Sequence, residues 1–227
     1  MAIDEQAGMR RMLEDIRREA YYTSDETGLP LFQEAVMAAM AAVPRLRFVP
    51  HGLEAAAFDN GPLPIGHGQP SSLPYIVALM CELLQVGKES VVLEVGTGSG
   101  YQAAVLAELV RQVYSLELVG ALADEAAQRL QRLGYHNVEV RQGDGYHGWP
   151  EHAPFDGIIV TAAAPHVPQA LVDQLREGAR LVIPVGEHYG PQQLLVVTKH
   201  HGRIEQRRVL PVAFVPLHHS AASPPAE

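Results

Sequence analysis

The sequence predicts an α/β fold: a Rossmann-like, doubly wound and mostly parallel sheet with an antiparallel pair of strands at its edge, preceded by an N-terminal extension of helices and loop. Three observations lead to this prediction. A short β-branched run at residues 91–95 breaks into three alternating glycines and is followed at once by helical spacing. Beyond it, strand-like runs alternate with helical ones, which favours crossover connections and parallel strands. The last two apolar runs are joined by a short polar turn, which favours a hairpin.

Residues 1–74 form the expected extension, with two helices and a loop on the substrate side of the core. Apolar residues share one face of a helix at about 7–21. A second helix at about 31–42 stops ahead of Pro44, because the residue before a proline avoids the helical region. From there to Gly68, prolines and glycines are frequent. Long loops in compact chains are more often functional than idle, so we expect this loop to cover the active site.

Residues 75–219 form the expected core, and the small, polar residues 220–227 are expected to be disordered. A helix at 74–84 leads into the strand at 91–95, and another helix follows the glycines. The remaining elements are a strand at 112–118, a helix at 122–134, a strand and glycine turn at 137–145, a strand at 155–163, a helix at 167–175, a strand at 179–186, and the antiparallel pair at 192–200 and 210–217.

Composition and charge argue against several classes of function. Acidic residues outnumber basic ones by 26 to 17, and the net charge of −9 disfavours a nucleic-acid-binding surface. The chain has no uncharged apolar run of about 18 residues and no signal-peptide core at its start, so we expect a cytoplasmic protein with no membrane partner. The single cysteine, Cys81, permits no internal disulfide, and no helical histidine pair supports a metal site. We expect a monomer without a bound metal.

The glycine loop predicts a nucleotide-like ligand. From Glu94 to Gly100 the sequence reads EVGTGSG, and glycines there let a ligand approach backbone N–H groups at the start of a helix. A dinucleotide fingerprint would need a third glycine at position 101, where Tyr101 stands. Glu117, which closes the next apolar run, suits the two hydroxyls of a ribose. Loop and acid together are similar to the S-adenosylmethionine loop of Rossmann-like methyltransferases, with a nicotinamide dinucleotide as the less favoured alternative.

Two further strand ends belong to the same edge of the sheet, where open α/β sheets bind their ligands. The turn GDG carries Asp144, whose carboxylate either accepts the exocyclic amine of an adenine or simply caps a turn. The fourth strand ends in small neutral residues at 161–164. It lacks the N-P-P-Y ending with which amino-directed nucleic-acid methyltransferases hold a base amine, so a nucleic-acid substrate is not expected.

Several longer motifs are specific to one family. They are VPRLRFVP at 43–50, LPIGHGQPSSLPYIVALM at 63–80, VLEVGTGSGYQAAVLAEL at 92–109, QGDGYHGWPEHAPFDGIIVTAAAPHVPQALVDQL at 142–175, LVIPVG at 181–186 and FVPL at 214–217. With these motifs, the chain resembles the protein-L-isoaspartate O-methyltransferase family over nearly its whole length. The resemblance implies methyl transfer from S-adenosyl-L-methionine to the free carboxylate of L-isoaspartyl residues in damaged proteins and peptides. This repair reaction leaves S-adenosyl-L-homocysteine.

The resemblance also assigns roles to residues. Ser72 matches the serine that ends the family's G-Q-T-I-S segment, the position usually assigned to the active site. Around it, we expect Ser71, His67, Gln69 and Val215 to bind the substrate, with residues 214–217 as an apolar wall. The cofactor-binding residues are Glu94, Gly96, Thr97, Gly98, Gly100, Glu117, Leu118, Gly143, Asp144 and Gly145.

The sequence departs from the family's pattern beside Ser72. It reads GQPSS at 68–72, where the family has a threonine and then an aliphatic residue. Proline at position 70 removes a backbone donor and the threonine hydroxyl, and Ser71 offers a hydroxyl from a different position. Two alternatives to the repair enzyme therefore stay open. One is a small-molecule carboxyl O-methyltransferase on the same scaffold, and the other is a non-catalytic module that binds the cofactor.

Overall fold

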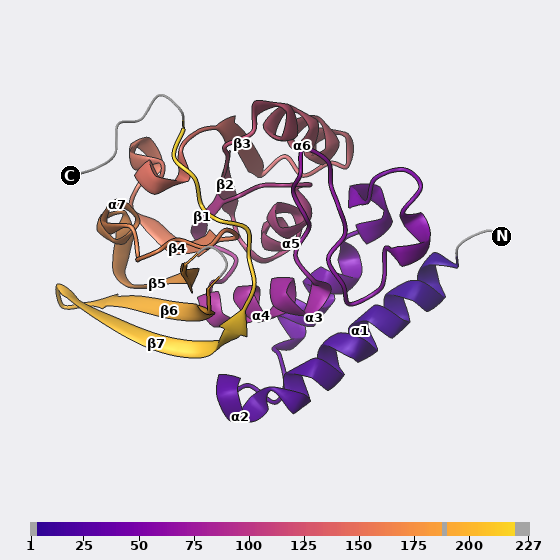
Figure 1. The fold of residues 1–227 in the computed structure, drawn as a ribbon, viewed down its shortest axis with the longest axis horizontal. Coiled ribbons are helices and arrows are strands. Elements are labelled where there is room, and N and C mark those ends of the chain that lie inside the picture. The colour runs from indigo at the N-terminus through magenta and orange to yellow at the C-terminus, as the bar shows by residue number, and fades with distance from the viewer. Residues whose placement is uncertain (1–3, 188–189, 221–227) are drawn as a thin grey trace.

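The computed structural model describes residues 4–187 and 190–220, which form one seven-stranded sheet with helices on both faces (Figure 1). The strand order is β3-β2-β1-β4-β5-β6-β7. Strands β1 to β5 run parallel, whereas β6 pairs antiparallel with both β5 and β7, so the predicted Rossmann-like sheet with an antiparallel edge is confirmed. The strands are β1 (Val91–Val95), β2 (Gln112–Glu117), β3 (Val138–Gln142), β4 (Phe155–Val160), β5 (Leu175–Gly186), β6 (Gln192–His200) and β7 (Arg203–Val212).

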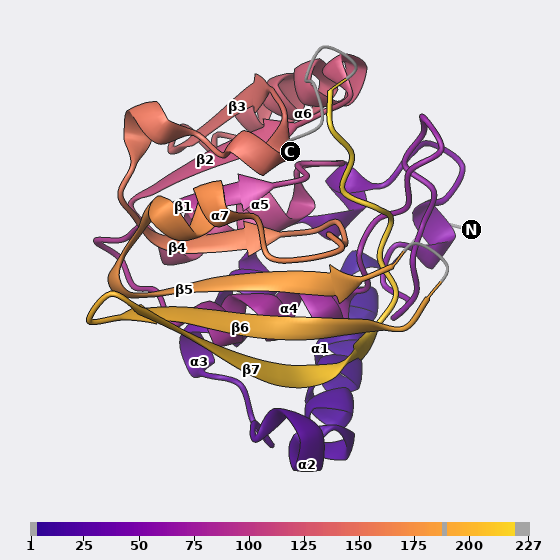
Figure 2. The same cartoon turned by 60° about the vertical axis from the view of Figure 1, so that its left-hand side comes forward.

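Helices lie in front of and behind the sheet (Figure 2). α4 and α5 pack on one face with α1 and α3 outside them, α6 packs against β2 and β3, and α7 packs against β5. The α-helices are α1 (Glu5–Tyr22), α2 (Ser24–Thr27), α3 (Glu34–Ala42), α4 (Pro74–Leu84), α5 (Tyr101–Leu109), α6 (Gly120–Arg132) and α7 (Gln169–Asp173). Short 3₁₀ turns are η1 (Arg45–Phe48), η2 (Glu54–Ala56), η3 (Gly145–His147) and η4 (Pro150–His152).

The central strand β1 is buried on both faces. Val92 belongs to the buried cluster that includes α4 and α5, whereas Leu93 and Val95 belong to the cluster on the α7 side. Because successive side chains of a strand point to opposite faces, Glu94 points to the same face as Val92. A parallel strand covered on both faces reads as a nearly continuous apolar run, which is why this strand is recognisable from the sequence.

The N-terminal helices follow the predicted pattern. α1 begins at its cap, Asp4, whose side chain accepts a hydrogen bond from the N–H of Ala7 at 2.9 Å. Its buried face, which includes Met12 and Ile16, belongs to the same cluster as Val92 of β1. α3 starts at Glu34, three residues later than predicted, and ends ahead of Pro44 as expected.

The loop that follows α3 is attached to the core through a buried arginine. Arg45 is 2% exposed, its Nε donates to the carbonyl of Ala57 at 2.7 Å, and its guanidinium lies 4.4 Å from the centroid of the Tyr101 ring. Burial lowers the pKa of this arginine, and the Tyr101 ring and hydroxyl oppose that effect. Tyr101 is the first residue of α5, so this contact fixes the loop beside the glycine turn.

The last strand differs from the prediction. We expected its apolar run at 210–217, but β7 spans Arg203–Val212, and the polar run that looked like a connection is most of the strand. Residues 203–208 are exposed and, apart from Ile204, polar, as suits β7 at the edge of the sheet, where charged side chains block pairing with other chains. The short turn is His201 and Gly202, both with positive φ, as two-residue hairpins require.

Two smaller boundaries also differ. β5 begins at Leu175 rather than at 179, because α7 spans only five residues. Beyond β7, residues 213–217 leave the sheet and cross the carboxyl ends of the parallel strands, where Pro216 forms an isolated bridge with Ala163. The predicted disordered tail lies outside the described residues from 221 onward.

Candidate cofactor and active site

The glycine loop between β1 and α5 has a backbone that only glycine adopts readily. Gly96, Gly98 and Gly100 have φ values of 96°, 53° and 85°. A Cβ atom on Gly96 would lie 2.2 Å from Oγ1 of Thr161, so a side chain does not fit there. Gly100 is the N-cap of α5, and a Cβ atom on it would lie 3.2 Å from Leu130. The predicted strand, tight turn and helix are therefore present.

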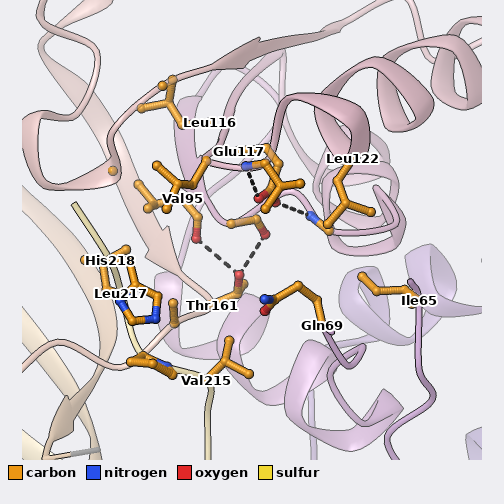
Figure 3. A pocket seen from close by; sticks show the side chains of 18 of the residues that line it. Ile65, Gln69, Val95, Leu116, Glu117, Leu122, Thr161, Val215, Leu217 and His218 are labelled. Atoms are coloured by element: carbon orange, nitrogen blue, oxygen red, sulfur yellow. Dashed lines mark hydrogen bonds between the residues drawn. The ribbon is translucent and has the colours of Figure 1, made fainter. Parts of the chain in front are cut away.

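Two neighbouring strand ends hold this loop in place (Figure 3). Glu117 at the end of β2 accepts the N–H of Gly98 at 2.8 Å through Oε2 and the N–H of Val119 at 3.0 Å through Oε1. Thr161, directly after β4, donates its hydroxyl to the carbonyl of Gly96 at 2.7 Å. Parallel strands end at the same edge of a sheet, so residues far apart in sequence fix one loop.

A further set of hydrogen bonds lies beneath the loop. Ser115 Oγ donates a short hydrogen bond to Oε2 of Glu94 and lies 2.6 Å from Thr97 Oγ1. Within the described part of the chain, Oε1 of Glu94 has no hydrogen-bond partner. Glu94 is completely buried, and burial raises its pKa to about 8, although the Ser115 hydrogen bond opposes the shift. At neutral pH the side chain is mainly a neutral acid beneath the loop.

A pocket opens over the glycine loop at the carboxyl ends of the strands (Figure 3). Eight of the residues assigned to cofactor or substrate line it: Gly96, Gly98, Glu117, Leu118, Gly143, Gly145, Gln69 and Val215. The sequence prediction missed part of the apolar lining, namely Ile65, Val95, Leu116, Val119 and Leu122. Val95, Leu116 and Val119 could have been identified from the sequence, because they directly precede Gly96 or lie within two residues of Glu117.

Asp144 lies between two glycines of this pocket, and its carboxylate is engaged elsewhere. Oδ1 accepts the N–H of Tyr146 at 2.9 Å and so caps η3, and Oδ2 accepts the N–H of Ser220 at 2.9 Å. Only 5% of the Asp144 side chain is exposed. Of the two readings that the sequence left open, the structure shows the capping contact, and contact with an adenine stays a prediction.

The departure at positions 70 and 71 fits a small hairpin. Ile65 N–H donates to Gln69 O at 2.9 Å, and Ser71 N–H donates to Leu63 O at 2.7 Å, which leaves Pro64 and Pro70 facing each other between these bonds. Neither proline stands where the ladder needs an N–H donor, so the hairpin loses no hydrogen bond to them.

Ser71 and Ser72 have different surroundings. The hydroxyl of Ser71 accepts the N–H of Leu63 at 3.1 Å and so clamps the hairpin. Ser72 lines a small cavity of about 60 Å³ together with Thr97 and Gln102. It also lines an apolar groove of about 400 Å³ formed by the hairpin, α4 and the segment after β7.

Three cavities therefore meet at one place. Pro70 and Thr161 line the pocket over the glycine loop, the small cavity and the apolar groove. Figure 3 shows Gln69 extending from the hairpin toward Thr161, with Val215 on the opposite side. Of the residues that the family resemblance places on the substrate side, His67 is separate, since its ring is 42% exposed and its Nε2 lies 4.0 Å from Glu125 on α6.

Within residues 4–187 and 190–220, no group of three or more His, Cys, Asp or Glu side chains is arranged to hold a metal ion. None of the helices in the described ranges is long and apolar enough to cross a membrane.

Comparisons with known proteins point to one family. A sequence model of the family described as Protein-L-isoaspartate(D-aspartate) O-methyltransferase matches residues 12–222. Protein-L-isoaspartate O-methyltransferase 2 of Syntrophobacter fumaroxidans is 59% identical over 212 residues, which cover 93% of this chain and 86% of the relative. The protein of the same name from a Polaromonas species is 56% identical over 207 residues, covering 91% and 98%.

Two solved structures share the whole fold. One, named protein-L-isoaspartate O-methyltransferase, aligns with a TM-score of 0.78 and 25% identity over 92% of this chain, which spans 65% of its length. The other is a Plasmodium falciparum protein described as a putative member of this family in complex with S-adenosyl-L-homocysteine. It aligns with a TM-score of 0.76 and 28% identity, covering 92% of this chain and 97% of its own.

Proposed function

This chain belongs to the protein-L-isoaspartate(D-aspartate) O-methyltransferase family, and we propose that it methylates the free carboxylate of L-isoaspartyl residues in damaged proteins and peptides. The observation that carries the proposal is the meeting of three cavities at Pro70 and Thr161. A cofactor over the glycine loop and a peptide in the apolar groove would touch there. Ser72 lines the groove at this point.

The pocket over the glycine loop suits S-adenosyl-L-methionine. Gly96 and Gly98 leave its floor free of side chains. A glycine is also needed at position 145, because a Cβ atom there would lie 2.2 Å from Val95. Each oxygen of Glu117 accepts one backbone N–H, and each retains a lone pair for a ribose hydroxyl. The apolar side chains of Leu116 and Leu122 suit the faces of a nucleoside.

The bound cofactor supplies a methyl group on a positively charged sulfur. The isoaspartyl carboxylate is ionised near pH 7 and attacks without a general base. A C–O bond forms as the C–S bond breaks, and the products are a methyl ester and S-adenosyl-L-homocysteine. The protein's work is then to place the carboxylate in line with the methyl group and to exclude water.

Ser72 is the proposed donor to the substrate carboxylate. Because it lines both the small cavity and the apolar groove, it would lie between the two bound ligands. The hairpin that carries it is held by the two Leu63–Ser71 hydrogen bonds, so the hydroxyl starts from a fixed backbone. The groove is lined by apolar residues such as Ile76 and Phe214, which suits the chain on either side of the damaged residue.

The test is transfer of labelled methyl from S-adenosyl-L-methionine to an L-isoaspartyl peptide, with the matching L-aspartyl peptide as control. We expect methylation of the first peptide only. Binding of S-adenosyl-L-homocysteine is measured in parallel by calorimetry. Binding without methylation of either peptide would favour a non-catalytic module. Methylation of small carboxylates in preference to the peptide would favour the small-molecule enzyme.

A further inference from the structure

Residues 213–220 cross the carboxyl ends of the parallel strands, and we call them the C-terminal strap. In Figure 2 the strap is the yellow segment that runs upward from the end of β7, between the sheet and the loop of the N-terminal extension. Ala163 holds its middle, donating its N–H to Val215 O at 2.7 Å and accepting from Leu217 N at 2.7 Å. Val215, Leu217 and His218 of the strap line the pocket over the glycine loop.

The end of the strap closes on Asp144. Oδ2 of Asp144 accepts the N–H of Ser220 at 2.9 Å, and Nδ1 of His219 lies 3.3 Å from the same oxygen. The His219 ring stacks on Tyr146 with centroids 3.9 Å apart and an angle of 16° between the planes. Tyr146 in turn donates its hydroxyl to Leu217 O at 3.3 Å. These contacts bury the carboxylate.

This closure bears on the cofactor pocket. Gly143 and Gly145 line the pocket, so Asp144 between them lies at its edge. Its Oδ1 is used by the N–H of Tyr146, and its Oδ2 is used by the strap. An oxygen of a carboxylate accepts about two hydrogen bonds, so a further donor at Oδ2 competes with those already present.

Resting on the proposed function, we propose that His219 and Ser220 set the affinity for the cofactor by competing with the 6-amino group of adenine for Oδ2 of Asp144. The strap-closed state holds Asp144, and the cofactor binds best when the strap releases it. A ligand that binds only one of two states has an apparent affinity reduced by the fraction of the competent state. Weakening the strap contact therefore tightens cofactor binding.

The test measures binding of S-adenosyl-L-homocysteine to the full chain by calorimetry. Ser220→Pro removes the N–H that Oδ2 accepts, and Ser220→Ala is the matched control, because it keeps this N–H. We expect Ser220→Pro to bind roughly threefold to tenfold tighter than the parent, the range that the net loss of one ordinary intramolecular hydrogen bond allows. Ser220→Ala should bind like the parent. His219→Ala should give a smaller gain and serves if the proline variant folds poorly.

A second ligand tests the chemistry of the competition. S-inosyl-L-homocysteine carries an oxo group in place of the 6-amino group, so it has no amine to offer Asp144. We expect no gain for this ligand in Ser220→Pro or His219→Ala. An equal gain for both ligands would overturn the proposal, since the strap would then act only by blocking the pocket. Unchanged or weaker binding of S-adenosyl-L-homocysteine in both variants would also overturn it. Absence of binding by the parent would contradict the proposed function itself.

Discussion

The two sides of the proposed active site are built in different ways. On the cofactor side, the N–H of Gly98 donates to Glu117, and the carbonyl of Gly96 accepts from Thr161. Both partners lie at the carboxyl ends of parallel strands of the sheet. On the substrate side, Ser72 follows a hairpin whose bonds join Leu63 to Ser71, outside the sheet. The geometry of the cofactor side is set by the sheet, whereas the substrate side is formed by loops that pack on the core.

This difference determines which positions tolerate substitution and which do not. A change in the glycine loop meets buried neighbours at short distance, as the 2.2 Å from a Cβ on Gly96 to Thr161 shows. The hairpin instead accommodates two prolines facing each other without losing a hydrogen bond. We therefore expect substitutions on the cofactor side to have the larger effects, with those at the hairpin altering substrate handling.

The largest effect is expected for Gly96→Ala. The new Cβ would displace Thr161 or the loop, and φ at this position is +96°. Since a misplacement of about 1 Å near the chemistry can lower a rate on the order of 100-fold, we expect kcat/KM to fall by at least that factor. Initial rates with an isoaspartyl peptide measure it.

Gly134→Ala is the control for backbone strain alone. Its φ is +87°, and no atom outside its chain neighbours lies within 4 Å of the added Cβ. It should lose about 1–2 kcal/mol of unfolding free energy and keep its kcat/KM. An equal loss of activity in both variants would contradict the steric account of Gly96.

Ser72→Ala should have the next largest effect. Loss of one hydrogen bond to a charged substrate group costs about 1.5–3 kcal/mol, which lowers kcat/KM by roughly 10- to 150-fold. Binding of S-adenosyl-L-homocysteine should be unchanged, because the variant alters only the substrate side. An unaltered kcat/KM would remove Ser72 from the proposed mechanism.

Glu94→Gln tests the buried acid beneath the loop. The pKa of Glu94 is raised to about 8 in the folded protein from an ordinary value of 4.5, so between these values the folded state holds a proton that the unfolded chain has released. Stability from this group is therefore greatest below pH 4.5 and is lost as pH rises toward 8. Glutamine stays neutral, so the free energies of unfolding of the two proteins should diverge in favour of Glu94→Gln by up to about 1.4 kcal/mol per pH unit in this window.

Urea denaturation of both proteins from pH 5 to pH 8 measures this divergence. Ser115→Ala is a second variant, because it removes the hydrogen bond that lowers the pKa of Glu94. In that variant the loss of stability should extend to higher pH. A difference between wild type and Glu94→Gln that is the same at every pH would show that Glu94 is ionised throughout.

The same contrast explains what the sequence could predict. Some features can be recognised from a few neighbouring residues: the glycines of the loop, the acid at the end of β2 and the apolar run of β1. Each of these lies in the pocket or beneath it. The order of strand-like and helical runs along the chain indicates which strands are parallel and which are antiparallel, so the parallel core and the antiparallel pair were predictable. Local signals failed at β7, because the exposed and mostly polar residues at 203–208 do not show the apolar alternation by which a strand is recognised.

Long-range contacts could not be predicted from local patterns. The hydrogen bond from Leu63 N–H to Ser71 depends on how the hairpin closes, and that from Ser220 N–H to Asp144 joins residues 76 positions apart. Asp144 and Ser71 were each predicted to contact a ligand, while the structure shows an intramolecular partner for both. Such pairings appear only once the fold brings the two segments together.

The smallest effect is expected for Pro70→Ala. Position 70 lies between the two hydrogen-bonded positions of the hairpin, so the alanine N–H gains no ladder partner and the native bonds persist. The variant should lose only about 0.4–1 kcal/mol of unfolding free energy, because the unfolded chain regains conformational freedom at this residue. Ser71→Ala, which deprives Leu63 N–H of its acceptor, is the matched comparison, with an expected loss of about 0.5–1.5 kcal/mol.

Thermal unfolding ranks these two hairpin variants, and peptide methylation shows whether the departure at position 70 affects substrate handling. Pro70 lines all three cavities, so its ring forms part of the surface between cofactor and substrate. If the hairpin alone positions Ser72, kcat/KM of Pro70→Ala should stay within about threefold of the parent, a difference below 1 kcal/mol. A larger loss with an unchanged melting temperature would instead show that the ring itself contacts the substrate. The hairpin would then place the carboxylate through the Pro70 ring as well as through Ser72.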